Sequence, residues 1–170
     1  MGEVGILRAD ARVELIDGEI IDMSPSRSRH AGVVRHMARL LERAVGDAAL
    51  VSVQSPVSLG DASEPEPDIA LLTPRADFYK SAHPRSADVM LIVEVADASL
   101  RYDRQIKVPL YARHAIAEVW IADIERDILT RYREPAGDGY RSVQSVADLT
   151  SVELSTPTGG TVDLSAVLSR

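Results

Sequence analysis

The stretch Val89-Met90-Leu91-Ile92-Val93-Glu94-Val95-Ala96 decides the fold, because it is an apolar run interrupted by a single acid. Such a run is typical of a β-strand that is covered on both faces. An ionised carboxylate at Glu94 would cost several kcal/mol there unless a cation compensates it. A buried ion pair with an arginine is one solution; a divalent metal ion or a lysine is the one that we favour.

A second acid stands at the start of the preceding apolar segment, where Pro67-Asp68 leads into Ile69-Ala70-Leu71-Leu72. Alone, Asp68 would be an ordinary residue at the start of a strand. Two acids on neighbouring strands, however, suggest a metal site, because Mg²⁺ and Mn²⁺ prefer oxygen ligands. The backbone carbonyl of Val95 is a candidate third ligand.

Length and composition predict one domain over residues 1–170. The chain is 45% hydrophobic and 26% charged, which suffices for one buried core and is short for two. It has no cysteine, so we expect a cytoplasmic protein without disulfides. Charged residues within 1–10 argue against a signal peptide. No apolar stretch approaches 18 residues, so we expect no membrane span.

The formal net charge of −7 argues against a general affinity for nucleic acid, because phosphate binding depends on lysine and arginine. Acids that gather around a metal ion are neutralised when it binds, so the argument is not decisive. One segment is locally basic although the chain is acidic overall; it contains Arg27, Arg29, Arg35, Arg39 and Arg43. Its simplest interpretation is a solvated helix face.

The first half of the chain predicts a hairpin, a helix and three strands. Residues 12–23 form the hairpin, since Asp17-Gly18 suits a two-residue turn with positive φ angles. Apolar residues from Val34 to Val45 recur at helical spacing up to Gly46. The strands are expected at 49–59, 68–72 and 89–96.

The second half predicts a helix and then strands. A helix that begins near Asp103 runs to Arg113, and strands follow at 118–123, 128–132, 140–146 and 161–164. The order of elements indicates an α/β fold in which helices pack on a mixed central sheet.

Lys107 is the candidate cation of the site. Metal-assisted phosphodiester hydrolysis needs a positive charge near the attacking water or the scissile phosphate. If the helix begins at Asp103, that acid lies four residues before Lys107 and can orient it. Without other support, Lys107 would be a solvated helix residue.

Five other side chains have simpler interpretations. His30 lies four residues before Val34, which predicts a core histidine; a role in positioning water or phosphate is the alternative. Glu14 and Glu19 flank the hairpin turn and are expected on the surface. Tyr111, like Trp120, is most simply a core aromatic.

The sequence resembles the Uma family of putative restriction endonucleases, part of the PD-(D/E)xK nuclease superfamily. The matching segments follow the family's order and span most of residues 13–134: Glu14-Leu15-Ile16-Asp17-Gly18-Glu19, Met23-Ser24-Pro25, His30, Glu66-Pro67-Asp68-Ile69-Ala70, Val93-Glu94-Val95, Asp103 to Lys107, Tyr111-Ala112-Arg113 and Glu118-Val119-Trp120-Ile121-Ala122-Asp123.

The resemblance implies a restriction-endonuclease-like core over about residues 12–134, with a β-rich extension at 135–170. It also implies a magnesium-dependent site and DNA as substrate. Asp68 matches the superfamily aspartate and Glu94 its second acid. The lysine expected two residues later is absent, because position 96 is alanine; Lys107 matches the family's helix lysine. The family shares Glu14, which raises an outer-shell or second-metal role.

We therefore expect a DNA endonuclease that uses Mg²⁺ or Mn²⁺, with Asp68, Glu94 and Val95 as ligands and Lys107 deprotonating or orienting water. Glu14, His30 and Asp103 would support them. Cutting both strands of a duplex favours a homodimer. Two alternatives stay open: a catalytically weak nuclease-fold protein with a binding or regulatory role, and a metal-dependent hydrolase of a small phosphoester.

Overall fold

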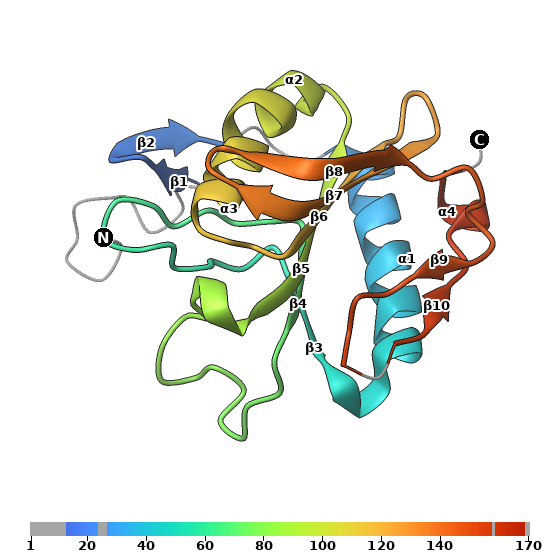
Figure 1. The fold of residues 1–170 in the computed structure, drawn as a ribbon, viewed down its shortest axis with the longest axis horizontal. Coiled ribbons are helices and arrows are strands. Elements are labelled where there is room, and N and C mark those ends of the chain that lie inside the picture. The colour runs from blue at the N-terminus through green and yellow to red at the C-terminus, as the bar shows by residue number, and fades with distance from the viewer. Residues whose placement is uncertain (1–12, 24–26, 158, 169–170) are drawn as a thin grey trace.

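A six-stranded mixed sheet forms the centre of the computed structural model, which describes residues 13–23, 27–157 and 159–168 (Figure 1). The strand order is β3-β4-β5-β6-β7-β8; β5 and β6 are parallel, and the other neighbours are antiparallel. This confirms the predicted fold class. The strands are β3 (Leu50–Val53), β4 (Ile69–Leu72), β5 (Val89–Ala96), β6 (Glu118–Asp123), β7 (Ile128–Ala136) and β8 (Gly139–Ser145).

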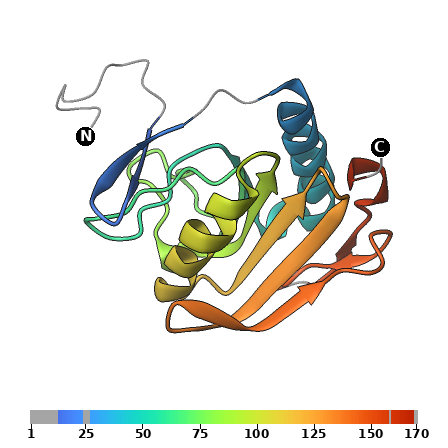
Figure 2. The same cartoon turned by 90° about the horizontal axis from the view of Figure 1, so that it is seen from above.

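Helices cover both faces of this sheet (Figure 2). On one face lie α1 (Ser28–Val45), the strand pair β9 (Val152–Glu153) and β10 (Thr161–Val162), and α4 (Ser165–Leu168). On the other lie α2 (Leu100–Tyr102), the π-helical segment η4 (Asp103–Lys107) and α3 (Val108–Arg113). The short 3₁₀ turns η2 (Gly46–Ala48) and η3 (Ser86–Asp88) lead into β3 and β5.

Alternation along β5 determines which face each of its side chains occupies. Leu91 and Val95 belong to the core beneath α1, whereas Ile92 and Ala96 belong to the core beneath α3. Glu94 shares the parity of the second pair, so it faces α3. The prediction of a strand buried on both faces is confirmed.

The predicted hairpin is confirmed as β1 (Val13–Ile16) and β2 (Glu19–Asp22). Asp17 and Gly18 have φ angles of 50° and 85°, as a primed turn requires. The turn is tied down, because the N–H of Gly18 donates to the Ala62 carbonyl at 2.7 Å and Arg113 pairs with Asp17 at 2.6 Å. The hairpin is therefore fixed to the loop before β4 and to α3.

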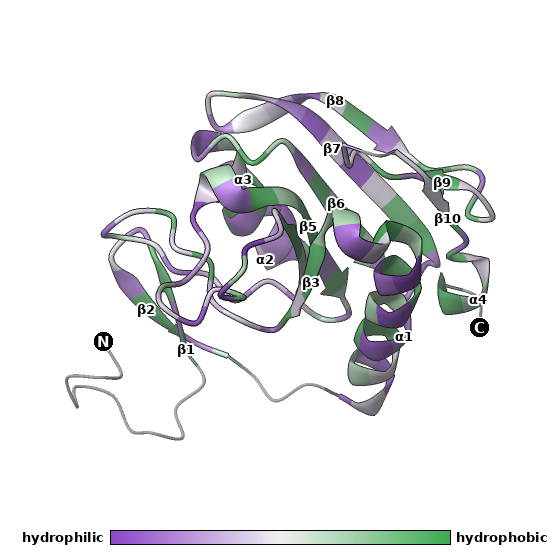
Figure 3. Ribbon diagram, turned by 90° about the horizontal axis from the view of Figure 1, so that it is seen from below, coloured by the Kyte–Doolittle hydropathy of each residue, from purple (hydrophilic) through white to green (hydrophobic). Residues whose placement is uncertain are grey.

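Helix α1 matches its prediction, with Val34, Met37, Ala38, Leu41 and Val45 buried. The outward side of the helix is hydrophilic (Figure 3). The helix ends at Gly46, whose φ of 49° suits a residue without a Cβ.

Two predicted strands are shorter than expected. The strand at 49–59 ends at Val53, because Gln54 has a φ of 45° and Pro56 has no N–H to donate. The strand at 161–164 is confined to Thr161–Val162, which pairs with β9. The strands at 68–72, 118–123, 128–132 and 140–146 are confirmed within a few residues as β4, β6, β7 and β8.

The predicted helix begins a few residues before Asp103, so Asp103 does not cap it. Helical structure begins at Leu100, and the N–H of Asp103 already donates to the Ser99 carbonyl at 2.9 Å. The following segment is π-helical, with the N–H of Val108 donating to Asp103. Pro109 lacks an N–H, and a wide turn accommodates the missing donor.

Some predictions lie outside the described residues: the N-terminal segment 1–10, the hairpin residue Arg12 and the break at 24–26. Among the helices of the described residues, none has the length and apolar character needed to cross a membrane.

A buried ion pair links β6 and β7 on the α1 side of the sheet. Glu118 Oε1 accepts hydrogen bonds from Arg131 Nε at 2.9 Å and from Trp120 Nε1 at 2.6 Å. Both charged side chains are buried. Removing one partner would leave the other charge uncompensated, which is far more costly than losing an exposed pair.

Glu118→Ala should therefore lower the free energy of unfolding by about 3–5 kcal/mol. Glu19→Ala, which removes an exposed glutamate of β2, should change it by less than about 0.5 kcal/mol. Urea denaturation at pH 7 measures both values. Equally small changes in the free energy of unfolding of the two variants would show that buried Arg131 does not need Glu118 as its ion-pair partner.

Candidate active site

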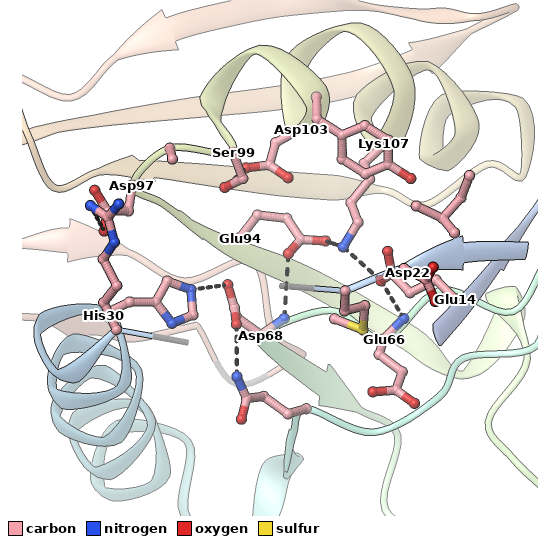
Figure 4. Close-up of a pocket in the computed structure, with 16 residues that line it drawn as sticks. Glu14, Asp22, His30, Glu66, Asp68, Glu94, Asp97, Ser99, Asp103 and Lys107 are labelled. Atoms are coloured by element: carbon pink, nitrogen blue, oxygen red, sulfur yellow. Dashed lines mark hydrogen bonds and ion pairs between the residues drawn. The ribbon is translucent and has the colours of Figure 1, made fainter. Parts of the chain in front are cut away.

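A pocket of about 450 Å³ lies where β4 begins and β5 ends, next to the hairpin and α2 (Figure 4). Its lining comes from β1, β2, the N-terminus of α1, the loop before β4, β5, and the α2–η4 segment. Seven lining residues are acids, namely Glu14, Asp22, Glu66, Asp68, Glu94, Asp97 and Asp103. Three carry basic groups, Arg27, His30 and Lys107, so the pocket has an excess of negative charge.

The two predicted strand acids meet in this pocket. Antiparallel pairing of β4 with β5 puts Ile69 opposite Val93, so Asp68 lies beside Glu94. The N–H of Asp68 is 3.4 Å from Glu94 Oε2, and Asp68 Oδ2 accepts a hydrogen bond from the N–H of Val95 at 2.9 Å. Residues 26 positions apart are thus held together by sheet register alone.

Glu94 is only 3% exposed, and two side chains contact one of its oxygens. Lys107 Nζ lies 3.2 Å from Oε1, and the Tyr111 hydroxyl donates to the same atom at 2.5 Å. Burial raises the pKa of Glu94 to about 8; Lys107 opposes this rise, while the charges of Asp103 and Asp68 add to it. The compensating cation is a lysine, and no arginine pairs with Glu94 among the described residues.

Lys107 is 5% exposed and lies between two carboxylates. Its Nζ is 2.8 Å from Glu14 Oε1 and 3.2 Å from Glu94 Oε1 (Figure 4). Burial disfavours the charged amine, but Glu94 and Glu14 outweigh burial and raise the pKa of Lys107 above its ordinary value. Lys107 is therefore not a solvated helix residue; these contacts favour its protonated form, which donates hydrogen bonds.

Glu14 contradicts the expectation of a surface carboxylate, because it is 2% exposed. Besides its pair with Lys107, it accepts a hydrogen bond from the N–H of Glu66 at 2.8 Å. Glu19, the other acid of the hairpin turn, is exposed as predicted. The signal for Glu14 was present in the sequence, since it shares a strand face with the buried Ile16.

Asp103 does not orient Lys107 as expected. Its carboxylate accepts a hydrogen bond from Ser99 Oγ at 2.7 Å, and it forms no ion pair with Lys107 among the described residues. Burial raises the pKa of Asp103 to about 6, while Ser99 and Lys107 act to lower it. Glu14, which lies in β1, pairs with Lys107 instead of Asp103.

His30 lines the pocket, so the prediction of a core histidine is wrong. Its Nε2 lies 3.1 Å from Asp68 Oδ2, and this contact raises the pKa of His30 against the effect of burial. Gln54 Nε2 donates to the other Asp68 oxygen at 3.2 Å. Burial alone would raise the pKa of Asp68, but His30, Val95 and Gln54 together lower it.

Sequence reasoning missed two contacts of the acids. Gln54 directly follows β3, has a positive φ angle and donates a hydrogen bond to Asp68. No sequence motif indicates this contact. Tyr111 is a core aromatic as predicted, but its hydroxyl also contacts Glu94. Its position four residues after Lys107 on one helix face was the available signal.

The donor set fits Mg²⁺ or Mn²⁺, which prefer oxygen ligands. The charge of Asp68 disfavours ionisation of Glu94, and a divalent ion would offset this effect. Within the described residues, no three His, Cys, Asp or Glu side chains form a ready metal cluster. Backbone carbonyl and water oxygens would have to complete the coordination.

A model of the family described as "Putative restriction endonuclease", Uma2, matches residues 4–165. The chain belongs to the Uma2 family. The fold agrees with this assignment, because a crystal structure of a putative nuclease belonging to DUF820 from Anabaena variabilis ATCC 29413 superposes with a TM-score of 0.67. The two chains share 14% sequence identity, and the match covers 92% of this chain and 87% of that one. No curated protein matches the sequence.

The titration of Glu94 should change the free energy of unfolding with pH. Burial raises the pKa of Glu94 from 4.5 to about 8, so between these values the folded state holds a proton that the unfolded chain has lost. The contribution of Glu94 to the free energy of unfolding therefore falls as pH rises through this window. Glu94→Gln removes the titrating group. Its stability relative to the parent should rise from pH 5 to pH 8 by at least ~1 kcal/mol.

Urea unfolding of both proteins at pH 5, 6.5 and 8 measures this difference, with the exposed Glu19→Gln as control. The control should show no trend with pH. A Glu94→Gln difference that is constant, or that shrinks with pH, would reject a carboxyl group held protonated by burial.

Proposed function

We propose that this Uma2 protein is a DNA endonuclease that hydrolyses phosphodiester bonds with Mg²⁺ or Mn²⁺. One observation carries the proposal: Asp68, Glu94 and the Lys107 amine, from three separate elements, converge in one acidic pocket. Family membership and the nuclease-like fold support it.

The protein residues would divide the work as follows. Asp68 and Glu94 would hold the metal ion, with the carbonyl of Val95 as third ligand. The bound ion would polarise the phosphate and lower the pKa of an attacking water. Lys107 orients that water through its N–H donors, since Glu14 and Glu94 favour its protonated form.

The remaining polar groups would position these three. Glu14 holds Lys107 from the hairpin side, and His30 fixes the carboxylate of Asp68 through Nε2. Asp103 adds negative charge to the pocket and is itself fixed by Ser99. Removing these groups should weaken catalysis less than removing a ligand.

The displaced lysine does not favour the catalytically weak alternative, because Lys107 brings its amine to 3.2 Å from Glu94. A hydrolase of small phosphoesters would use the same ligands, and its distinguishing property would be the absence of salt-dependent affinity for DNA. The proposal also includes a homodimer, which would provide one site for each strand of a duplex. A cytoplasmic location fits a DNA substrate and a chain without cysteine.

Supercoiled plasmid should be nicked or linearised by the parent protein in Mg²⁺ or Mn²⁺ and not in EDTA. Asp68→Asn, Glu94→Gln and Lys107→Met should each lower the cleavage rate by at least about 100-fold, because each removes charge stabilisation of the transition state. Initial rates on agarose gels measure the effect.

Glu19→Gln and Lys80→Met are the matched controls, since both residues are exposed and lie outside the pocket. They should cleave at the parental rate. Equal activity of Glu94→Gln and the parent would disprove the assignment of the site, as would cleavage that persists in EDTA.

A further inference from the structure

Three arginines form an exposed row on α1, which we call the arginine stripe: Arg35, Arg39 and Arg43. They recur every four residues, so they follow one side of the helix. The buried residues Val34, Met37, Ala38, Leu41 and Val45 occupy the opposite side. Figure 3 shows this outward side of α1 as hydrophilic.

The arginine stripe lacks acidic partners within residues 13–23, 27–157 and 159–168. Among the described residues, none of the three side chains has an ion pair or hydrogen bond. Glu42 is the one acid in segment 27–45, which holds five arginines in a chain of net charge −7. Arg27 and Arg29, by contrast, lie within 3.9 Å and 3.6 Å of Asp97 and Asp127.

The stripe runs away from the pocket along one rigid element. The first turn of α1 provides His30, which contacts Asp68, and Arg43 follows 13 residues later. At 1.5 Å per residue this separation is about 20 Å along the helix axis. A strand that enters the pocket at its scissile phosphate could therefore continue along α1.

We propose that the arginine stripe binds the backbone of the DNA that flanks the scissile phosphate; this inference rests on the proposed function. Successive stripe residues are about 6 Å apart along the helix. Phosphates on one strand recur every ~3.4 Å of duplex axis, so each arginine can reach a different phosphate. Exposed guanidinium groups without acid partners gain most from such contacts, because no internal ion pair must be broken.

Fluorescence anisotropy with a labelled 30-base-pair duplex in Ca²⁺ tests the inference. In Arg35→Gln/Arg39→Gln/Arg43→Gln, affinity should fall, and the slope of log Kd against log salt should decrease by about 2 to 3, since each lost phosphate contact contributes about 0.9. Where the parent cleaves DNA, KM should rise while kcat is retained, because the stripe lies outside the pocket.

The control is Lys80→Gln/Arg85→Gln/Arg141→Gln, which removes the same charge from exposed residues of the β4–β5 connection and of β8. Its salt slope should change by less than about 1. Both variants should keep the parental unfolding midpoint, because all six residues are exposed.

Equal loss of affinity in the two triple variants would overturn the inference, because total charge and not position would then matter. Absence of DNA binding by the parent at 25 mM salt would also overturn it. If the parent binds DNA through the stripe but does not cleave it, the proposed function is rejected, while the stripe is still supported as a DNA-binding surface.

Discussion

A carboxylate buried in a strand without exposed faces is the constraint on which the rest of the site depends. Glu94 lies in β5 between two hydrophobic cores, where an isolated charge would be strongly unfavourable. Three groups contact its carboxyl oxygens, and they come from η4, α3 and the start of β4: Lys107, the Tyr111 hydroxyl and the N–H of Asp68. The compensation of Glu94 therefore depends on the relative placement of these three elements.

The hairpin also contributes to the charge balance of the site. Glu14 reaches Lys107 at 2.8 Å, so β1 and η4 are joined through a lysine that Glu94 also needs. Once Glu94 is ionised, two carboxylates surround one amine and leave the group with surplus negative charge, to which Asp68 and Asp103 add. That surplus is the physical reason why we expect a divalent cation in the pocket.

The sequence predicted the parts of the site that depend on strong local patterns. Glu94 and Asp68 stand out against apolar runs, and β-sheet pairing of those runs brings them together. Lys107 required the family resemblance, because a single lysine on a helix is usually solvated. The surface position expected for Glu14 was wrong, since its burial depends on where the whole hairpin docks, although alternation with Ile16 placed both on one face.

Other features could not be predicted because they depend on long-range geometry or on backbone detail. Gln54 reaches Asp68 only because β3 stops early at a positive φ angle, which a Val- and Ser-rich run does not indicate. Helical structure begins at Leu100 and turns π-helical at Asp103, and the partner of Asp103 is Ser99. His30 contacts Asp68 instead of the core because the N-terminus of α1 stands at the pocket.

Anomalous diffraction from a crystal soaked in Mn²⁺ tests the central claim most directly. The account predicts one peak within about 2.0–2.4 Å of an oxygen of Asp68 and an oxygen of Glu94, with Lys107 still beside the second acid. A map at saturating Mn²⁺ with no peak there, or with the ion bound elsewhere and Glu94 contacted by Lys107 and Tyr111 alone, would contradict it.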